Sequence, residues 1–241
     1  MLDWRFAPKK RTRNMRNTII YILGHSGSGK YTIGTEIAKL HNFKLIDNHY
    51  INNVIFQLIE TDGKSKLPEK VWEFTRSVRK AVFGTIKELS SIESNFIFTN
   101  ALMKEQEISE PIYQDILEIV KNRKAIFFPV VLDISKNELK NRISNSERRE
   151  RYKDISPENA EKAFDNFHVF EPYYENTFHI NVDNKTAKEA AIEILEKISL
   201  TIASTWLGYV TVIAVATLGN NRAMYASQVK RMLGRRFAPG E

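Results

Sequence analysis

The fold is decided by the stretch 18–30, which reads TIIYILGHSGSGK. Its first six residues are apolar or β-branched without strict alternation, which is typical of a strand buried on both faces of a parallel sheet. A glycine-rich turn follows, and Ile33, Ile37 and Leu40 then recur at helical spacing. Strand, glycine turn and helix together predict the first half of a βαβ unit.

The turn 24–30, GHSGSGK, has the spacing of the phosphate-binding Walker A motif up to its lysine. Glycines let backbone N–H groups turn inward around phosphate oxygens, because no Cβ stands in the way. The helix that follows directs its positive end at the same anion, and Lys30 can reach the β- and γ-phosphates. A chance glycine-rich turn is the alternative, but the flanking strand and helix are the context that the motif requires. The predicted nucleotide contacts are Gly24, His25, Ser26, Gly27, Ser28, Gly29, Lys30, Tyr31 and Thr32.

One position departs from the motif. A Ser or Thr is expected directly after the lysine, where its hydroxyl binds magnesium, but this chain has Tyr31. A phenol oxygen lies too far from its backbone to replace that hydroxyl, and Thr32 is about 100° further around the helix. Magnesium would then be held through water or by a carboxylate from another strand. The alternative is a domain that binds a nucleotide without turning it over.

The alternation of strands and helices continues along the chain. Apolar runs predict further strands at 43–47, 96–98, 125–132 and 177–182. Helices are expected at 51–59, 68–90 and 111–120, and after Ser135, Ser156 and Thr186. The predicted fold class is α/β: a three-layer P-loop NTPase fold with a five-stranded parallel sheet and helices on both faces.

The long helix 68–90 has two faces of different character. Its predicted core stripe is Val71, Phe74, Val78, Val82, Ile86 and Leu89. The opposite face is formed, at 4-3-4 spacing, by Trp72, Arg76, Arg79 and Phe83. Two arginines beside aromatic rings could clamp an anionic or ring-bearing substrate. A solvated charged face is the alternative.

Ligands of open α/β sheets bind beyond the carboxyl ends of the strands. The polar residues at those ends are Asp47, Thr99, Asn100 and Asp133. Asp47 could orient a substrate hydroxyl, accept its proton, or hold magnesium through water. Its alternative role is an Asx turn or a cap for the next helix.

A charged stretch, SERRERYKD at 146–154, follows the fourth strand and its helix. Arginines on a segment there could close over bound phosphates and exclude water. The arginines in question are Arg148, Arg149 and Arg151. A solvated charged face is again the alternative.

With these residues placed, the region 17–198 resembles the P-loop small-molecule kinases, the fold shared by shikimate, gluconate and nucleoside-monophosphate kinases. The loop 24–30 is the one highly specific motif. Three motifs together look like a bacterial branch often labelled only as ATPase or shikimate-kinase-like: Gly29-Lys30-Tyr31-Thr32, Asp47-Asn48-His49 and Phe98-Thr99-Asn100. The glycine-rich substrate loop of shikimate kinases is absent after Asn100, so shikimate itself is not the expected acceptor.

The resemblance implies ATP and Mg²⁺ as cofactors, with Lys30 on the β- and γ-phosphates and the adenine near 183–186. Asp47 would catalyse by facing the acceptor or magnesium. Acceptor binding would fall to Asp47, Arg76, Arg79 and Asn100. Closure of a catalytic lid would fall to Arg148, Arg149 and Arg151.

Composition limits the remaining possibilities. The chain has no cysteine, which excludes disulfides and thiolate metal sites and fits a cytoplasmic protein. The net charge of +7 is concentrated at the two ends, because 1–16 carries +5 and 222–241 carries +4, leaving −2 for the rest. Solvated termini are therefore favoured over nucleic-acid-binding arms.

The predicted organisation is a basic extension at 1–16, a kinase-like domain at 17–198, and an apolar segment with a basic tail at 199–241. The uncharged run 198–221 is long enough for a membrane helix. A peripheral helix, strand or oligomer contact is favoured, because the basic tail would place the domain on the side away from ATP.

The leading hypothesis is an ATP-dependent phosphotransferase that acts on the hydroxyl of a small metabolite. Alternatives are a phosphotransferase for a nucleotide, an antibiotic or an RNA end, and a non-catalytic nucleotide-binding switch or ATPase.

Overall fold

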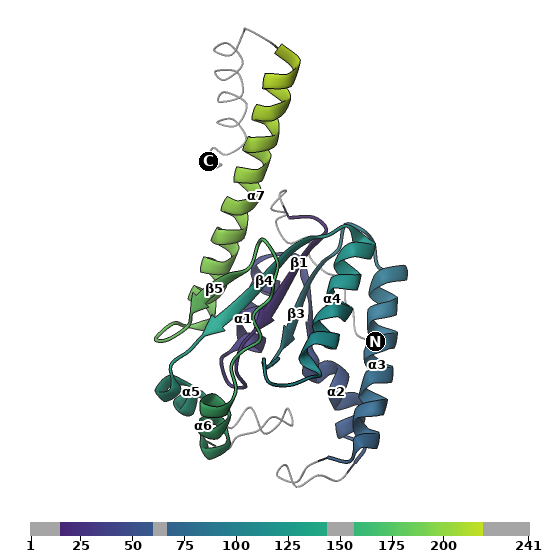
Figure 1. Ribbon diagram of the computed structural model, residues 1–241, viewed down its shortest axis with the longest axis vertical. Helices are drawn as coiled ribbons and strands as arrows, with labels where there is room; N and C mark the ends of the chain where they lie inside the picture. Colours follow the sequence, from purple (N-terminus) through teal and green to yellow (C-terminus); the bar gives the residue numbers. More distant parts are fainter. Residues whose placement is uncertain (1–14, 60–66, 144–156, 219–241) are drawn as a thin grey trace, which may run out of the picture. The chain divides into compact units, whose positions relative to one another are not determined.

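The computed structural model describes residues 15–59, 67–143 and 157–218 (Figure 1). The strands are β1 (Thr18–Leu23), β2 (Phe43–Asp47), β3 (Asn95–Asn100), β4 (Ile126–Asp133) and β5 (Phe178–Asn181). The helices are α1 (Lys30–Leu40), α2 (Asn48–Phe56), α3 (Glu69–Glu88), α4 (Ser109–Arg123), α5 (Lys136–Ile143), α6 (Pro157–Asn166) and α7 (Ala187–Leu218).

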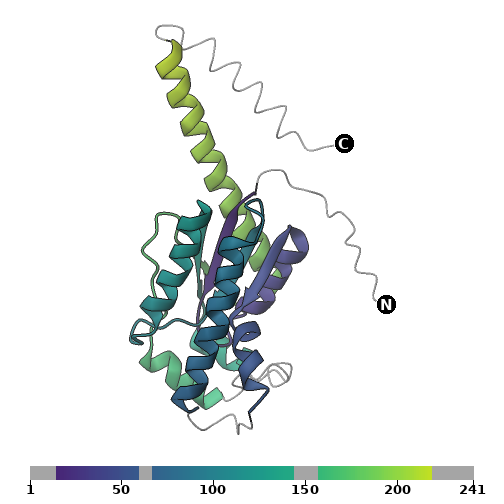
Figure 2. The same ribbon diagram turned by 90° about the vertical axis from the view of Figure 1, so that its right-hand side faces the viewer.

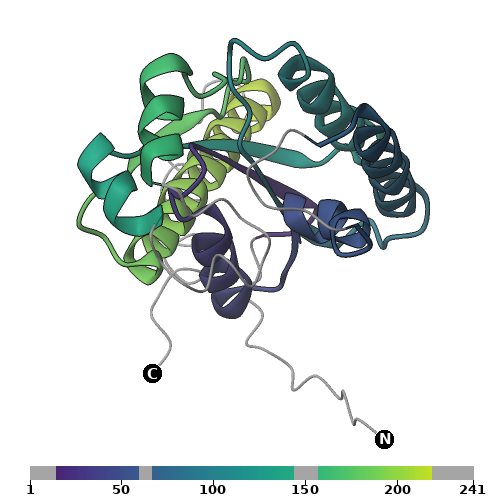
Figure 3. The ribbon, with the colours of Figure 1, turned by 90° about the horizontal axis from the view of Figure 1, so that it is seen from below.

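All five strands form one parallel sheet in the order β2-β3-β1-β4-β5. The predicted five-stranded α/β fold is therefore confirmed. Strand register places Thr99 of β3 between Asp47 of β2 and Ile22 of β1. The polar carboxyl ends of the strands consequently lie together at one end of the sheet, the end that faces the viewer in Figure 3.

Helices cover both faces of the sheet. On one face α3 and α4 lie side by side (Figures 1 and 2) over a core that includes Tyr21, Phe98 and Phe127. Buried residues of α1 and of the first turns of α7, such as Ile37 and Ile194, lie outside that core cluster. They cover the opposite face, which gives the predicted three layers.

The core face of α3 differs from the predicted stripe. Phe74 and Leu89 are 52% and 80% exposed, and Thr75 and Phe83 are buried instead. Thr75 tolerates burial because its hydroxyl donates to the carbonyl of Trp72, and the ring of Phe83 packs edge-on against Phe98 of β3. Placing Phe83 on the outer face was wrong, because the buried stripe is shifted around the helix toward Thr75 and Phe83, by less than one residue.

A buried arginine fastens α4 to the end of α3. Arg123 is 2% exposed, and its guanidinium lies 5.0 Å from the centroid of the Phe96 ring. It donates hydrogen bonds to four backbone carbonyls, those of Ile86, Ser90, Ser91 and Ser94. Helix ends leave carbonyl oxygens without backbone partners. Arg123 supplies donors from a different helix to carbonyls at the end of α3 and in the loop that follows it.

The chain divides into two compact units, 1–195 and 196–241, with the boundary inside α7. The described part of the second unit is the remainder of α7, which takes in most of the predicted apolar segment. Among the described residues, none of the helices combines the length and the apolar character that crossing a membrane demands. The predicted basic tail and the arginines of 148–151 lie outside the described residues.

At the sheet edge, His179 of β5 lies between two carboxylates. Its Nδ1 is 3.0 Å from Asp133 and its Nε2 is 3.1 Å from Glu171. Burial lowers the pKa of His179, but the hydrogen bonds that the imidazole donates to the two carboxylates outweigh it, and the net pKa lies above the ordinary value. The charged imidazole thus stabilises the fold fully below the unfolded pKa of about 6.5, and this stabilisation is lost as pH rises through the folded pKa.

We expect His179→Gln to lower the free energy of unfolding by about 0.5 kcal/mol at pH 6, a small value because all three side chains are half exposed. At pH 9 the difference between variant and wild type should be close to zero. Urea unfolding at the two pH values measures it. A difference that stays constant with pH would contradict this account of the ion triad.

Candidate active site

A cavity of about 510 Å³ opens at the carboxyl end of the sheet. Its lining includes most of the predicted nucleotide contacts, namely Ser26, Gly27, Gly29, Lys30, Tyr31 and Thr32. Two of the predicted acceptor contacts, Asp47 and Asn100, line the same cavity. The predicted site residues from the glycine turn, the start of α1, and the ends of β2 and β3 are therefore brought together in one place.

The glycine turn has the backbone geometry of an anion cradle. Gly27 and Gly29 have φ angles of 98° and 97°, a left-handed conformation that favours glycine. A Cβ at Gly27 would stand 2.9 Å from the side chain of Leu139 in α5. Gly29 is also the N-cap of α1, so the positive end of this helix faces the turn. The loop fits a bound phosphate chain in both shape and charge.

Lys30 lies over this loop. Its Nζ donates to the carbonyl oxygens of Gly24 and His25 at 2.8 and 2.7 Å. Both contacts are to the turn itself, and a bound phosphate would offer the same ammonium group stronger, charged acceptors. Lys30 is thus held at the cavity wall, where the motif requires a cation.

Tyr31 is directed toward α2. Its ring meets Tyr50 edge-on at 6.1 Å, and the two hydroxyls are 3.2 Å apart. Thr32 donates its hydroxyl to the carbonyl of Gly29 at 2.8 Å. Both hydroxyls therefore contact groups of the protein, the Tyr50 hydroxyl and the Gly29 carbonyl.

His25, within the loop, packs against α6. Its ring centroid is 5.0 Å from that of Phe164. Burial, and secondly the charge of Lys30, hold the pKa of His25 below its ordinary value. The imidazole is therefore neutral at pH 7 and adds no charge to the loop.

Asp47 caps α2, which is one of its predicted roles, and it also lines the cavity. Its Oδ1 accepts the backbone N–H of His49 at 2.9 Å. Its Oδ2 accepts a hydrogen bond from the hydroxyl of Thr99 at 2.8 Å. The Asp47 carboxylate is consequently held at the strand ends by neighbours on two sides.

Asn100, the other predicted acceptor contact in the lining, donates its amide to the buried hydroxyl of Tyr21 at 3.0 Å.

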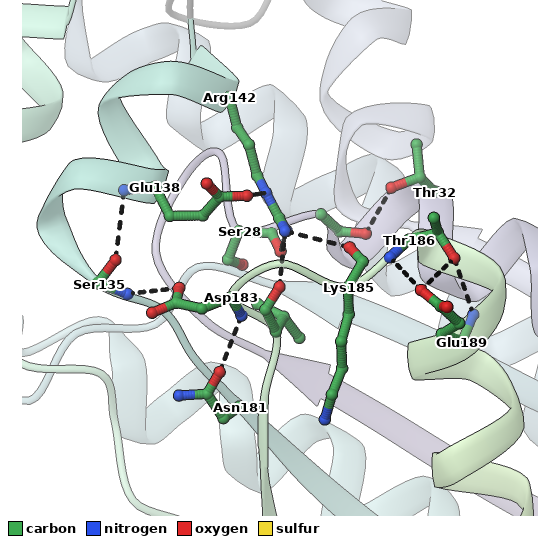
Figure 4. A network of polar contacts seen from close by, with 12 residues as sticks. Ser28, Thr32, Ser135, Glu138, Arg142, Asn181, Asp183, Lys185, Thr186 and Glu189 are labelled. Carbon is green, nitrogen blue, oxygen red and sulfur yellow. Dashed lines mark hydrogen bonds and ion pairs between the residues drawn. The ribbon is translucent and has the colours of Figure 1, made fainter.

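Arg142 of α5 joins two walls of the cavity (Figure 4). Its guanidinium donates to the carbonyls of Val182 and Lys185, at 2.6 and 3.3 Å, and lies 3.4 Å from that of Ser28. Glu138, one turn earlier, accepts from its Nε at 2.7 Å. The i, i+4 spacing of Glu138 and Arg142 indicates their ion pair in the sequence. The carbonyl partners of Arg142 come from a loop distant in the sequence, which this spacing does not reveal.

Three of the other predicted residues lie away from the cavity lining. Arg76 is exposed and contacts Glu69 at 3.4 Å. Arg79 is half-buried between helices, where burial lowers its pKa and Asp115 and Tyr21 lie near enough to oppose that shift. Asp133 contacts His179 instead. The structure does not bring Arg76 or Arg79 to the cavity wall.

The described residues contain no group of three or more His, Asp or Glu side chains arranged to hold a metal ion. Within the cavity lining the carboxylates are those of Asp47 and Glu138, and Glu138 is paired with Arg142.

Sheet order, phosphate loop and cavity define the class: the chain has the P-loop kinase fold. No model of a protein family matches it. In sequence it is 24% identical over 201 residues to a shikimate kinase from Prochlorococcus marinus, a match that covers 82% of this chain and 96% of that one. The chain is thus similar in sequence, over most of its length, to a shikimate kinase.

Solved structures agree on the fold. A gluconokinase from Sinorhizobium meliloti 1021 superposes with a TM-score of 0.52 at 14% identity, over 80% of this chain and 98% of that one. A candidate kinase from Chloroflexus aurantiacus gives a TM-score of 0.53 at 12% identity, over 77% and 98%. The expected resemblance to the small-molecule kinases of this fold is confirmed.

Proposed function

We propose that the protein is a kinase that transfers the γ-phosphoryl group of ATP to a hydroxyl of a small metabolite. The observation that carries the proposal is the pairing, in one cavity, of a phosphate cradle containing Lys30 with a buried strand-end carboxylate, Asp47. Phosphoryl transfer needs little more from a protein than positioning and neutralisation of charge. The homology to a shikimate kinase supports the same reaction class.

ATP would be bound along the cavity from the glycine turn to the loop before α7. The turn and the first residues of α1 would hold the phosphates. Val182, Lys185 and Thr186 line the other end, and the adenine would lie there. Arg142 connects these two ends, which supports a binding site for one extended ligand.

Magnesium would enter this cavity bound to the nucleotide phosphates. Asp47, directly or through water, is the residue that would hold it, and the ion would neutralise charge on the β- and γ-phosphates. Lys30 would stabilise the negative charge that moves during transfer. Asn100 and Asp47 would receive the acceptor hydroxyls, and the arginines of 148–151 would close over the site.

The test is transfer of label from γ-labelled ATP, with magnesium, to components of a metabolite extract by the purified full-length protein. A new labelled product identifies the acceptor by its mass. Label that stays on ATP across a broad set of hydroxyl-bearing metabolites would refute the proposal, provided that the protein still binds ATP.

Lys30→Ala should lower the rate of product formation about 100-fold or more, because one preorganised donor to the transition-state charge is lost. The matched control is Lys39→Ala, which removes an exposed lysine of the same helix that contacts Glu36. The control should retain the wild-type rate within about twofold. Equal rates for Lys30→Ala and Lys39→Ala would show that Lys30 does not contribute to catalysis.

A nucleotide-binding switch is the second candidate, and the orientation of Tyr31 toward Tyr50 favours it. A switch without phosphoryl transfer has no need of a metal-binding hydroxyl after the lysine. ATP affinity measured with magnesium and with a chelator separates the two. Equal affinities favour the switch, and tighter binding with magnesium favours the kinase.

A further inference from the structure

Thr99 makes a buried contact that the capping of α2 does not require. Its Oγ1 donates to Oδ2 of Asp47 at 2.8 Å, and the two residues are only 2% and 3% exposed. They are register partners on adjacent strands, β3 and β2. The sheet itself therefore fixes the distance between the hydroxyl and the carboxylate.

The second oxygen of the carboxylate is fixed independently. A capping aspartate needs only a backbone N–H of the first helical turn, and His49 supplies that N–H to Oδ1. The Thr99 contact to Oδ2 is additional, so capping alone does not explain it. With a donor on each oxygen, from two different elements, the plane of the carboxylate is held against rotation.

The threonine is well suited to this task. A β-branched side chain on a strand has restricted χ1 freedom, so the hydroxyl is oriented before any ligand arrives. Thr99 and Asp47 both line the cavity. A reacting group misplaced by about 1 Å can cost about 100-fold in rate, which gives a fixed carboxylate orientation direct kinetic value.

We propose that Thr99 is a positioning residue, whose hydroxyl holds the Asp47 carboxylate in the orientation that meets the acceptor hydroxyl. This inference rests on the proposed function for its kinetic consequence. Thr99 would act by orienting Asp47 and would not itself contact the reacting atoms.

The experiment compares Thr99→Val, which keeps the shape of the side chain but lacks the donor, with Thr99→Ser, which keeps the donor. Thr99→Val should lower kcat about 10- to 100-fold and leave KM for ATP within about twofold. Thr99→Ser should recover kcat to within about threefold of wild type. If Thr99→Val does not fold, Thr99→Ala takes its place.

The matched control is Thr18→Val. Thr18 is also fully buried on a strand of the same sheet, but it begins β1, and its hydroxyl lies 3.3 Å from the carbonyl of Arg16. Both valine variants lose one buried hydroxyl, so a general effect on the fold appears in both. Only Thr99→Val should change kcat.

Crystal structures of wild type and Thr99→Val supply a readout that needs no activity. The inference expects the Asp47 carboxylate to be rotated, or to occupy two orientations, in the variant. If the wild type transfers no phosphoryl group, the proposed function fails, and these structures alone decide the role of Thr99. An unmoved carboxylate overturns the inference, as does a Thr99→Val enzyme with wild-type kcat or a Thr99→Ser enzyme as slow as Thr99→Val.

Discussion

Replacing Arg123 by methionine should lower the free energy of unfolding by about 3–5 kcal/mol, a large part of the 5–15 kcal/mol that holds a typical domain folded. The side chain is almost fully buried, and its partners are four carbonyl oxygens at the end of α3 and in the loop to β3. Methionine would fill most of the volume but donate nothing. Buried carbonyls left without a donor cost about 1–3 kcal/mol each, which is why packing alone does not compensate.

Urea unfolding followed by circular dichroism measures this effect. Arg16→Met is the matched control, because Arg16 forms one exposed ion pair with Glu93, and it should change stability by no more than about 0.5 kcal/mol. Arg123→Lys, which keeps a buried cation but fewer donors, should lose less than Arg123→Met. A loss below about 1 kcal/mol for Arg123→Met would show that the carbonyls find other partners.

Arg123 also shows what a sequence leaves hidden. Five strands and the phosphate loop were predictable because each depends on local patterns, and β1 and β2 have the predicted bounds. A single arginine at the end of an amphipathic helix has no local pattern that separates it from a solvated cation. Its four partners lie about 30 to 40 positions earlier in the chain, and only the packing of α4 against α3 brings them together.

The site divides in the same way. Lys30 and the glycines could be predicted because the motif specifies both spacing and conformation, and Asp47 because the strand-end rule applies to any parallel sheet. The contacts of Thr99 and Arg142 are made with partners from other elements, which one sequence does not reveal. For Arg76 and Arg79, helical spacing gave the right helix but not its rotation against the sheet, and neither reaches the cavity lining.

Asp47→Asn should lower kcat about 1,000-fold, within the range of 10²- to 10⁴-fold that a positioned acid or base contributes. The amide keeps the size of the carboxylate but loses the charge and one of its two acceptor oxygens. It therefore no longer receives the acceptor proton, and it holds a metal ion less well. ATP affinity without magnesium should stay within about threefold of wild type, because the phosphate cradle belongs to another element.

Steady-state kinetics with the identified acceptor, together with ATP titration, measures both quantities. The matched control is Asp133→Asn, since Asp133 also ends a strand of the sheet but contacts His179 and lies outside the cavity lining. It should retain kcat within about twofold. If Asp47→Asn transfers phosphate at the wild-type rate, Asp47 only caps α2, and the inference from Thr99 fails with it. If Asp47→Asn and Thr99→Val lose rate together and the double variant loses no more than Asp47→Asn alone, the two residues act as one unit.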